Sequence, residues 1–259
     1  MRLGGRIQAA VDVIKDMDER KRPLAQSLKD WGNAHRFAGS GDRAAIGNIA
    51  YDALRLASSS CWLAGEETPA AKVFGGLMRL QGLTPDGLKE ALEGDKFAPD
   101  LPSDAVLHKL YEADLSEAAL HVQADIPEWL SSSFEANFEE EWVSEAQALA
   151  GRPPLDLRIN TLKSSKEKVL KAIKGTKLSA IARQGLRIPP VAQDRRHPNV
   201  QAEPGYQKGW FEVQDEGSQI VADLVFARPG EQVLDYCAGA GGKPLALAAM
   251  MNNRGQIHA

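Results

Sequence analysis

The chain has 259 residues, of which 43% are hydrophobic and 25% charged, which is ordinary for a globular protein. Its two cysteines, Cys61 and Cys237, are too few for a disulfide framework or a zinc cluster. The longest apolar runs are far shorter than a membrane span, and the N-terminal residues carry no apolar signal core. We therefore expect a cytoplasmic protein without membrane or metal sites.

Charge is distributed unevenly along the chain, although the net charge is only −4. Residues 101–150 contain 11 acidic residues and one lysine, whereas residues 151–200 contain 12 basic and 3 acidic residues. A change in the sign of the net charge between neighbouring segments predicts a modular chain in which one module binds an anion.

Residues 1–126 are predicted to form an all-α bundle with a linker, because apolar residues recur there at helical spacing. Asp42 is the predicted N-cap of one helix, and Cys61 is predicted to be a core residue of another. Residues 94–126 have little pattern and are predicted to be a linker on the surface. The predicted helices of the bundle run from Ile7 to near Pro23, Leu24 to Trp31, Asp42 to Arg55, Ala70 to Leu80 and Pro85 to Leu92.

Residues 127–209 are predicted to hold one long helix followed by a small α+β module. The helix would cover Pro127 to Ala150 with a solvated acidic face. Alternating residues from Pro154 to Asn160 predict a strand. A helix capped by Ser164 or Ser165 should follow and reach Ile173.

Residues 210–259 have the order of elements that opens a doubly wound α/β domain. A helix is expected over 216–226, a strand over 232–235 and, after a glycine-rich loop, a helix over 244–251. A second strand is expected to be only beginning at 255–259. A single strand and helix would leave both edges of the sheet without partners, so we expect a half-formed cofactor site.

The sequence of the glycine-rich loop, Asp235 to Lys243, can be compared with the loop patterns that bind three classes of ligand. A P-loop would need glycine at Cys237 and a hydroxyl side chain at Pro244. A dinucleotide loop beginning at Gly239 would need a third glycine at Pro244. The remaining pattern, two apolar residues followed by Asp-x-x-x-Gly-x-Gly, resembles the first loop of S-adenosylmethionine-dependent methyltransferases. A tight turn without a ligand is the alternative.

Several segments closely resemble the RsmB/Nop/Sun family of RNA cytosine-5 methyltransferases. They are Val213 to Gln219, Pro229 to Glu231 and Val233 to Lys243, with a weaker likeness at Pro154 to Lys163 and Phe37 to Gly47. The resemblance implies a NusB-like helical domain (1–126), an RNA-binding module with its preceding helix (127–209) and the start of a Rossmann-like domain (210–259). Pro244 departs from the usual threonine.

The resemblance also implies S-adenosylmethionine as cofactor and RNA, ribosomal in particular, as substrate. The expected cofactor-binding residues are Cys237, Ala238, Gly239, Ala240, Gly241, Gly242 and Lys243. In the family a cysteine thiolate adds to cytosine C6 and a second cysteine assists product release. Both lie beyond the positions matched here, so Cys237 is expected to pack rather than react. We expect the 259-residue chain alone to be inactive and to bind cofactor weakly.

The basic segment is expected to contact RNA phosphates through Arg158, Lys163, Lys166, Lys171 and Lys174. The four lysines would share one side of a helix, from which Lys168 points away. Arg195 to His197 would extend this patch. Trp210 and Phe211 are predicted to belong to the core of the sheet. A solvated lysine face is the alternative to RNA contact.

Three functions follow from this sequence. The first is an RNA cytosine-5 methyltransferase, of which residues 1–259 would be the N-terminal and central part. The second is a non-catalytic RNA-binding protein that keeps the first two modules. The third is a NusB-like partner-binding protein with no role in RNA.

Overall fold

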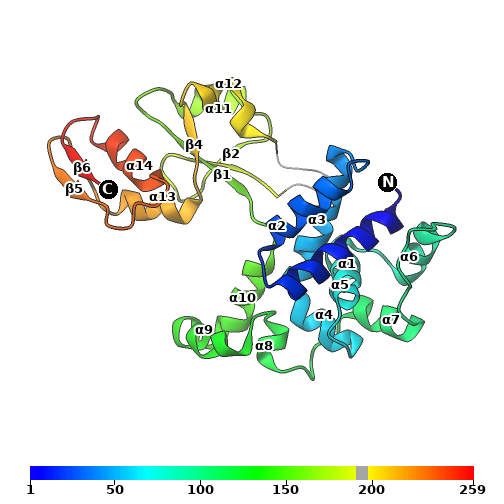
Figure 1. The fold of residues 1–259 in the computed structure, drawn as a ribbon. Coiled ribbons are helices and arrows are strands. Elements are labelled where there is room, and N and C mark those ends of the chain that lie inside the picture. The colour runs from blue at the N-terminus through cyan, green and yellow to red at the C-terminus, as the bar shows by residue number, and fades with distance from the viewer. Residues whose placement is uncertain (191–197) are drawn as a thin grey trace. The chain divides into compact units, whose positions relative to one another are not determined.

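A computed structural model describes residues 1–190 and 198–259 of the chain (Figure 1). The described residues form two compact units, 1–152 and 153–190 with 198–259. Each unit has a hydrophobic core of its own. The predicted extension of the basic patch at Arg195 to His197 lies outside the described residues.

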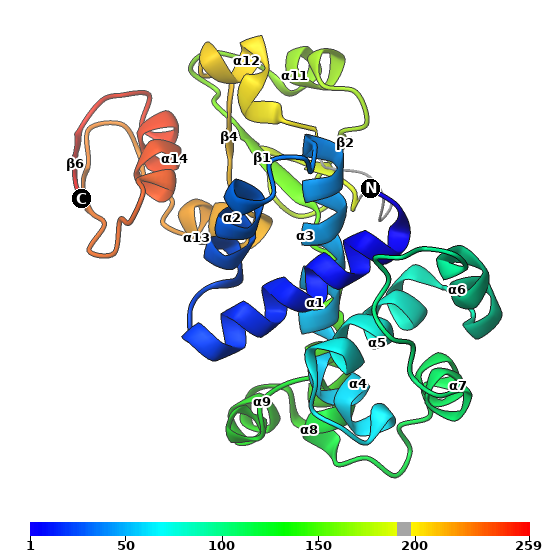
Figure 2. The ribbon, with the colours of Figure 1, turned by 45° about the vertical axis from the view of Figure 1, so that its right-hand side comes forward.

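The first unit is entirely helical. Its main core is built around Phe74 and includes Ile14, Ile46 and Leu77, all with 1% or less of their surface exposed. Figure 2 shows α1 crossing α3, and the two helices are in contact. The elements are α1 (Leu3–Arg20), α2 (Leu24–Ala34), α3 (Ser40–Arg55), α4 (Ala57–Ala64), α5 (Pro69–Gln81), α6 (Pro85–Leu92), α7 (Asp104–Glu112), α8 (Leu120–Gln123), η1 (Glu128–Leu130), α9 (Ser131–Phe138), η2 (Glu139–Glu141) and α10 (Trp142–Ala150).

Helix α5 shows how local sequence fixes the ends of these helices. The Thr68 side chain caps its start by accepting a hydrogen bond from the backbone N–H of Ala71 at 3.1 Å. Pro69 follows at the first helical position, where its missing N–H costs nothing. Gly82 ends the helix in the left-handed conformation, with φ of 66°.

Two expectations for residues 1–126 are wrong. Gly39, not Asp42, is the N-cap of α3; Asp42 lies in the first turn and forms an ion pair with Arg6 at 2.8 Å. The segment 94–126 is not a surface linker, because α7 buries Leu107 and Leu110 completely in the main core. The two leucines lie one helical turn apart, and an apolar pattern of a single turn is too short to predict a helix.

The helix predicted over 127–150 is broken into shorter elements. Glu139 ends α9 with φ of 49°, a left-handed conformation, and α10 starts only at Trp142. Trp142 and Ala146 pack against Ala124 in a small separate cluster. In α4, Cys61 is partly buried rather than a core residue, and Trp62 is 42% exposed.

The second unit contains a four-stranded antiparallel sheet in the order β2-β3-β1-β4. Along the chain these strands alternate with α11 and α12 as β-α-β-β-α-β, which is the ferredoxin-like arrangement. Both ribbon views show α11 and α12 side by side. The elements are β1 (Leu155–Ile159), α11 (Lys166–Ala172), β2 (Lys177–Leu178), β3 (Gly185–Ile188), η3 (Val200–Ala202), α12 (Pro204–Gln207) and β4 (Phe211–Val213).

One face of this sheet forms the core of the second unit. Leu157, Ile159 and Leu186 of the strands pack with Val169 of α11, and each is 1% exposed or less. Phe211 is also 1% exposed, which confirms its predicted place in the core. Trp210 is only partly buried at the edge of the same cluster.

The rest of the second unit begins with α13 (Glu216–Asp223), which ends three residues earlier than predicted. It continues with β5 (Gln232–Leu234), α14 (Gly242–Met250) and β6 (Gln256–His258). Strands β5 and β6 pair in parallel, with Val233 opposite Ile257. The expectation of a lone strand is therefore wrong, because residues 256–258 form the second strand of a parallel β-α-β unit whose helix is α14.

Candidate functional site

The four lysines predicted to contact RNA lie in and around α11, whose bounds agree with the helix predicted from Ser164 to Ile173 to within two residues. Helix α11 contains Lys166 and Lys171, whereas Lys163 lies in the preceding turn and Lys174 follows the helix. The prediction that one helix carries all four is wrong. Lys166 is partly exposed and the other three are exposed. Within the described part of the chain, none of the four forms an ion pair with a carboxylate.

The start of α11 is fixed by its local sequence. Ser165 is the N-cap, and its hydroxyl accepts a hydrogen bond from the Lys168 N–H at 3.4 Å. Glu167 lies in the first turn, as predicted. Hydrogen bonds from its own backbone N–H and from Ser165 lower the pKa of the Glu167 carboxyl. The one acidic residue among these lysines is thus engaged with the helix end.

Lys168 takes part in a feature that the sequence did not reveal. Its ammonium nitrogen lies 3.9 Å from the centroid of a Trp210 ring, and Lys208 approaches the same residue at 5.4 Å. Such contacts hold a cation over the negative face of an aromatic ring. Trp210 therefore links α11 to the segment before β4 and gathers two more positive charges there.

Arg158 is located differently from the lysines. It lies in β1 with only 4% of its surface exposed. Its Nε donates a 2.6 Å hydrogen bond to Oε1 of Gln214, and burial lowers the pKa of its guanidinium. The structure therefore separates Arg158 from the exposed lysines with which the sequence grouped it.

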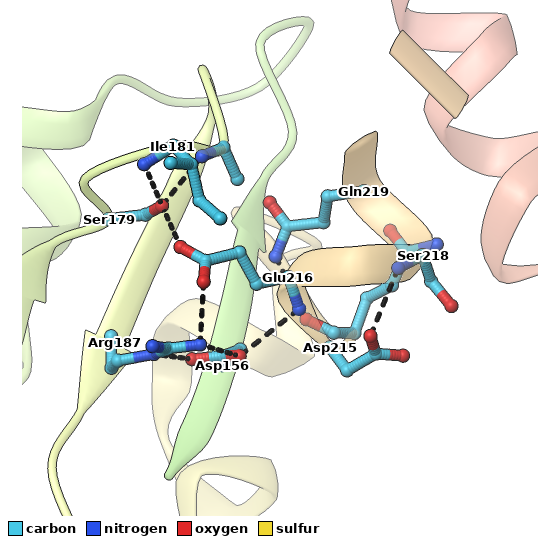
Figure 3. Close-up of polar contacts among 10 residues, drawn as sticks. Asp156, Ser179, Ile181, Arg187, Asp215, Glu216, Ser218 and Gln219 are labelled. Atoms are coloured by element: carbon cyan, nitrogen blue, oxygen red, sulfur yellow. Dashed lines mark hydrogen bonds and ion pairs between the residues drawn. The ribbon is translucent and has the colours of Figure 1, made fainter. Parts of the chain in front are cut away.

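A polar network joins the sheet to α13 (Figure 3). Asp156 of β1 accepts two hydrogen bonds from Arg187 of β3, at 2.7 and 2.9 Å. Arg187 also forms an ion pair with Glu216 at 2.8 Å, and the Ser179 hydroxyl donates to the same glutamate. Arg187 belongs to the basic segment, yet its charge is used inside the unit. This network was not predicted from the sequence, although an acidic residue, Asp156, in a predicted strand of alternating apolar residues is a signal that could have indicated it.

The glycine-rich loop connects β5 to α14. The Asp235 N–H donates to the His258 carbonyl at 2.8 Å, and Oδ1 of Asp235 accepts from the Cys237 N–H at 3.2 Å. Gly239 and Gly241 have φ of 54° and 86°, conformations that residues with a Cβ rarely adopt. Gly241 is the N-cap of α14, so the helix starts two residues before its predicted beginning at Pro244.

The loop has open space and unpaired polar groups that a ligand could use. A Cβ added at Gly239 or Gly241 would meet no atom within 4 Å, so the space beside the backbone is open. Oδ2 of Asp235 is buried without a hydrogen-bond partner among the described residues. The backbone N–H groups of Gly242 and Lys243 lie in the first turn of α14, where helical N–H groups have no partner within the helix.

Cys237 is exposed in this loop. The other cysteine, Cys61, belongs to the first unit, where burial raises the pKa of its thiol. A raised pKa keeps a thiol protonated and unreactive. In the described part of the chain no three metal-ligating side chains gather, and no helix there has the length and apolar character needed to cross a membrane.

Comparisons with known proteins agree with this geometry. Residues 126–189 match the family model of the RsmF/B-like methyltransferase ferredoxin-like domain. A probable ribosomal RNA small subunit methyltransferase B of Synechocystis is 33% identical over 154 residues, which are 56% of this chain and 33% of that relative. The ribosomal RNA small subunit methyltransferase B of Pseudomonas putida is 35% identical over 117 residues, which are 45% of this chain and 26% of that relative.

A solved structure shares the fold. The crystal structure of PH0851 superimposes with a TM-score of 0.61 and 20% identity, over 99% of this chain and 63% of that protein. The chain matches only about a third of the Synechocystis relative and a quarter of the Pseudomonas putida relative.

Proposed function

We propose that this chain, which belongs to the family of RsmF/B-like methyltransferases, serves the S-adenosylmethionine-dependent methylation of cytosine C5 in RNA. Ribosomal RNA is the proposed substrate, because the relatives are ribosomal RNA methyltransferases. The cytoplasm is the proposed location. One observation carries the proposal. A single compact unit contains both a lysine-rich ferredoxin-like module and a parallel β-α-β unit whose first strand is followed by the glycine-rich loop.

The exposed lysines would hold the RNA backbone. Lys163, Lys166, Lys171 and Lys174 form no close ion pair with a carboxylate in the described part of the chain, so their ammonium groups can contact phosphates. Phosphate contacts of this kind position an RNA without reading its sequence. Trp210, with Lys168 and Lys208 over it, would widen the positive surface.

Residues 237–243 would hold the methionine end of the cofactor, which supplies the methyl group when bound. The open space at Gly239 and Gly241 would allow the ligand to approach the backbone, and the N–H groups of Gly242 and Lys243 would meet its carboxylate. The three-residue strands β5 and β6 form only a two-stranded sheet. A calorimetric titration of residues 1–259 with S-adenosylmethionine should therefore show weak or no binding, and tight binding would contradict this.

The family resemblance implies that both catalytic cysteines lie after the loop. Residues 1–259 alone are therefore proposed not to transfer a methyl group, and the exposed Cys237 is proposed not to act as the nucleophile. The test is incubation of this polypeptide with RNA and cofactor carrying a labelled methyl group. Label in the RNA would refute the proposal, and its loss in Cys237→Ser would identify Cys237 as the nucleophile.

The RNA-binding part is tested by removing the lysines. A triple variant of Lys166, Lys171 and Lys174 to alanine should bind a structured RNA at least about tenfold more weakly at physiological salt, since three phosphate contacts are lost. The matched control changes three exposed lysines of the first unit, Lys15, Lys29 and Lys109, to alanine. Equal losses in both variants would show that only overall charge matters.

A non-catalytic RNA-binding protein is the second candidate, and the same lysines support it. The two functions can be distinguished by assaying RNA binding and methyl transfer with the complete protein purified from its source cells. RNA binding with methyl transfer supports the enzyme, and RNA binding without it supports the second candidate. A protein that shows no RNA binding would fit the third function, partner binding through a NusB-like domain.

A further inference from the structure

A hollow of about 430 Å³ lies within the second unit, on the side of β1 where Arg158 is buried. Residues at the end of β1, in α13 and in α14 line it, among them Arg158, Gln219 and Met250. Its size falls within the range of sites that hold a small molecule or one nucleotide. The hollow is distinct from the cofactor loop, because it is lined by the later part of α14, from Ala246 onward, whereas the loop leads into the first turn.

The buried guanidinium of Arg158 has a donor that nothing in the described residues accepts. Its Nε is satisfied by Gln214, at 2.6 Å. Its Nη2 is buried and has no hydrogen-bond partner there, although Arg158 lines the hollow. An unpaired buried donor on a charged group costs several times more free energy than a normal hydrogen bond contributes. A ligand that supplied an acceptor would remove this cost.

Gln219 adds an unpaired acceptor to the wall of the same hollow. Its side-chain amide donates to the Gln214 carbonyl at 2.8 Å, which fixes the orientation of the amide. The other end, Oε1, is buried and has no donor among the described residues. Two residues of the lining thus carry one donor and one acceptor that are buried without partners among the described residues, and their side chains are 4% and 3% exposed.

Two further arginines bring positive charge to the hollow. Arg183 and Arg228 both line it, both are exposed, and neither guanidinium has an ion pair in the described part of the chain. Asp223, also in the lining, is the single acidic side chain there. A bare anion would use the arginines but would meet the lone pair of Gln219 Oε1 unfavourably. A ligand that combines an anion with a neutral donor–acceptor group uses every one of these groups.

We propose that this hollow binds one nucleotide of an RNA strand, with its base edge or ribose hydroxyl against Arg158 and Gln219 and its phosphate against Arg183 and Arg228. Nucleobase edges and ribose hydroxyls carry both donors and acceptors, and phosphates pair with guanidinium groups in a two-point geometry. The inference rests on the proposed RNA-binding function and adds to it a second contact, separate from the exposed lysines and from the cofactor loop.

The test uses the 259-residue chain and a short oligoribonucleotide containing 4-thiouridine. The double variant R183E/R228E should bind it at least about tenfold more weakly than the wild type. The matched control R36E/R254E makes the same change of charge at exposed arginines outside the hollow. Irradiation should cross-link the oligonucleotide to peptides that contain residues 158–161, 183–184 or 246–252. Because all four arginines are exposed, neither variant is expected to perturb folding.

A second arm titrates cytidine monophosphate and inorganic phosphate. The nucleotide should bind more tightly than phosphate, and R183E/R228E should weaken its binding. Equal affinity of the two ligands would overturn the proposed base or ribose contact. RNA binding that is unaffected by R183E/R228E, with cross-links elsewhere, would overturn the hollow as a site and leave the proposed function standing. If the wild type binds no RNA, the proposed function fails. Binding of cytidine monophosphate that depends on Arg183 and Arg228 would in that case still support a nucleotide site in the hollow. If cytidine monophosphate does not bind either, the nucleotide site is overturned as well.

Discussion

Asp156 and Arg187 face each other across β1 and β3 and form a two-point ion pair, with Nε 2.7 Å from Oδ1 and Nη2 2.9 Å from Oδ2. Oδ2 of Asp156 also accepts the first N–H of α13, from Glu216, at 3.1 Å. The pair therefore does more than join two strands. It also holds the start of α13, the helix that precedes β5 and the glycine-rich loop, against the ferredoxin-like sheet (Figure 3).

Removal of Asp156 should destabilise the second unit strongly. The Asp156 side chain is 8% exposed. Its loss would leave the Glu216 N–H without an acceptor and would leave Arg187 with Glu216 alone as its ion-pair partner. We expect Asp156→Ala to lower the free energy of unfolding by about 3 kcal/mol, measured by urea denaturation. Asp86, 96% exposed and 3.9 Å from Lys89, is the matched control. Its change to alanine should cost less than about 0.5 kcal/mol, and equal losses would contradict the assigned role of the network.

Asp215 should make the stability of α13 depend on pH. The Asp215 carboxylate accepts the Ser218 N–H at 3.0 Å, and this hydrogen bond lowers the pKa of Asp215. Because the folded pKa lies below the unfolded one, the ionised group stabilises the fold above the unfolded value, about 3.9, and the stabilisation is lost as pH falls through the folded pKa. Asp215→Ala should cost about 1 kcal/mol at pH 7 and less at pH 3.

The measurement for Asp215 is urea unfolding of wild type and variant at both pH values. Asp215→Asn keeps an N-cap side chain and should stay close to the wild type at pH 7. A cost of Asp215→Ala that is constant between pH 7 and pH 3 would show that ionisation of this carboxyl does not contribute.

The substitution Gly76→Ala should lower the stability of the first unit, whereas alanine in place of an ordinary helical glycine raises stability. An added Cβ would lie 2.9 Å from the Ala53 nitrogen, because α5 and α3 approach closely there. Alanine normally stabilises a helix by about 1 kcal/mol relative to glycine. Gly76→Ala should instead destabilise the first unit by about 1–3 kcal/mol, as overpacking does.

Gly47 in α3 is the matched control for Gly76. A Cβ there would meet only Cδ1 of Leu28 at 3.8 Å, an ordinary contact. Gly47→Ala should therefore raise the midpoint of thermal unfolding, whereas Gly76→Ala should lower it. Changes of the same sign in both variants would contradict the close packing of α3 and α5.

Local patterns in the sequence predicted most of the regular elements. The helix predicted from Ala70 to Leu80, the alternation that predicted β1 and the cap of α11 predicted at Ser164 or Ser165 all depend on residues a few positions apart. Phe211 was placed correctly in the core, whereas Trp210, predicted there with it, is only partly buried.

Contacts between distant residues were beyond this reasoning. Arg158 was grouped with exposed lysines because it belongs to the basic segment 151–200, but the strand buries it against Gln214, 56 positions away. The left-handed turn at Glu139 and the pairing of β5 with β6 likewise depend on where the chain packs. The candidate RNA contacts could thus be chosen by charge, whereas the hollow beside Arg158 could not be foreseen.

The most direct test of the RNA-binding account is the dependence of RNA affinity on salt. In a plot of log Kd against log salt concentration, the variant of Lys166, Lys171 and Lys174 to alanine should have a slope smaller by about 2 than the wild type, since each phosphate contact contributes about 0.7. The control variant of Lys15, Lys29 and Lys109 should keep the wild-type slope. Equal slopes for wild type and the first variant would contradict the claim that this module holds RNA.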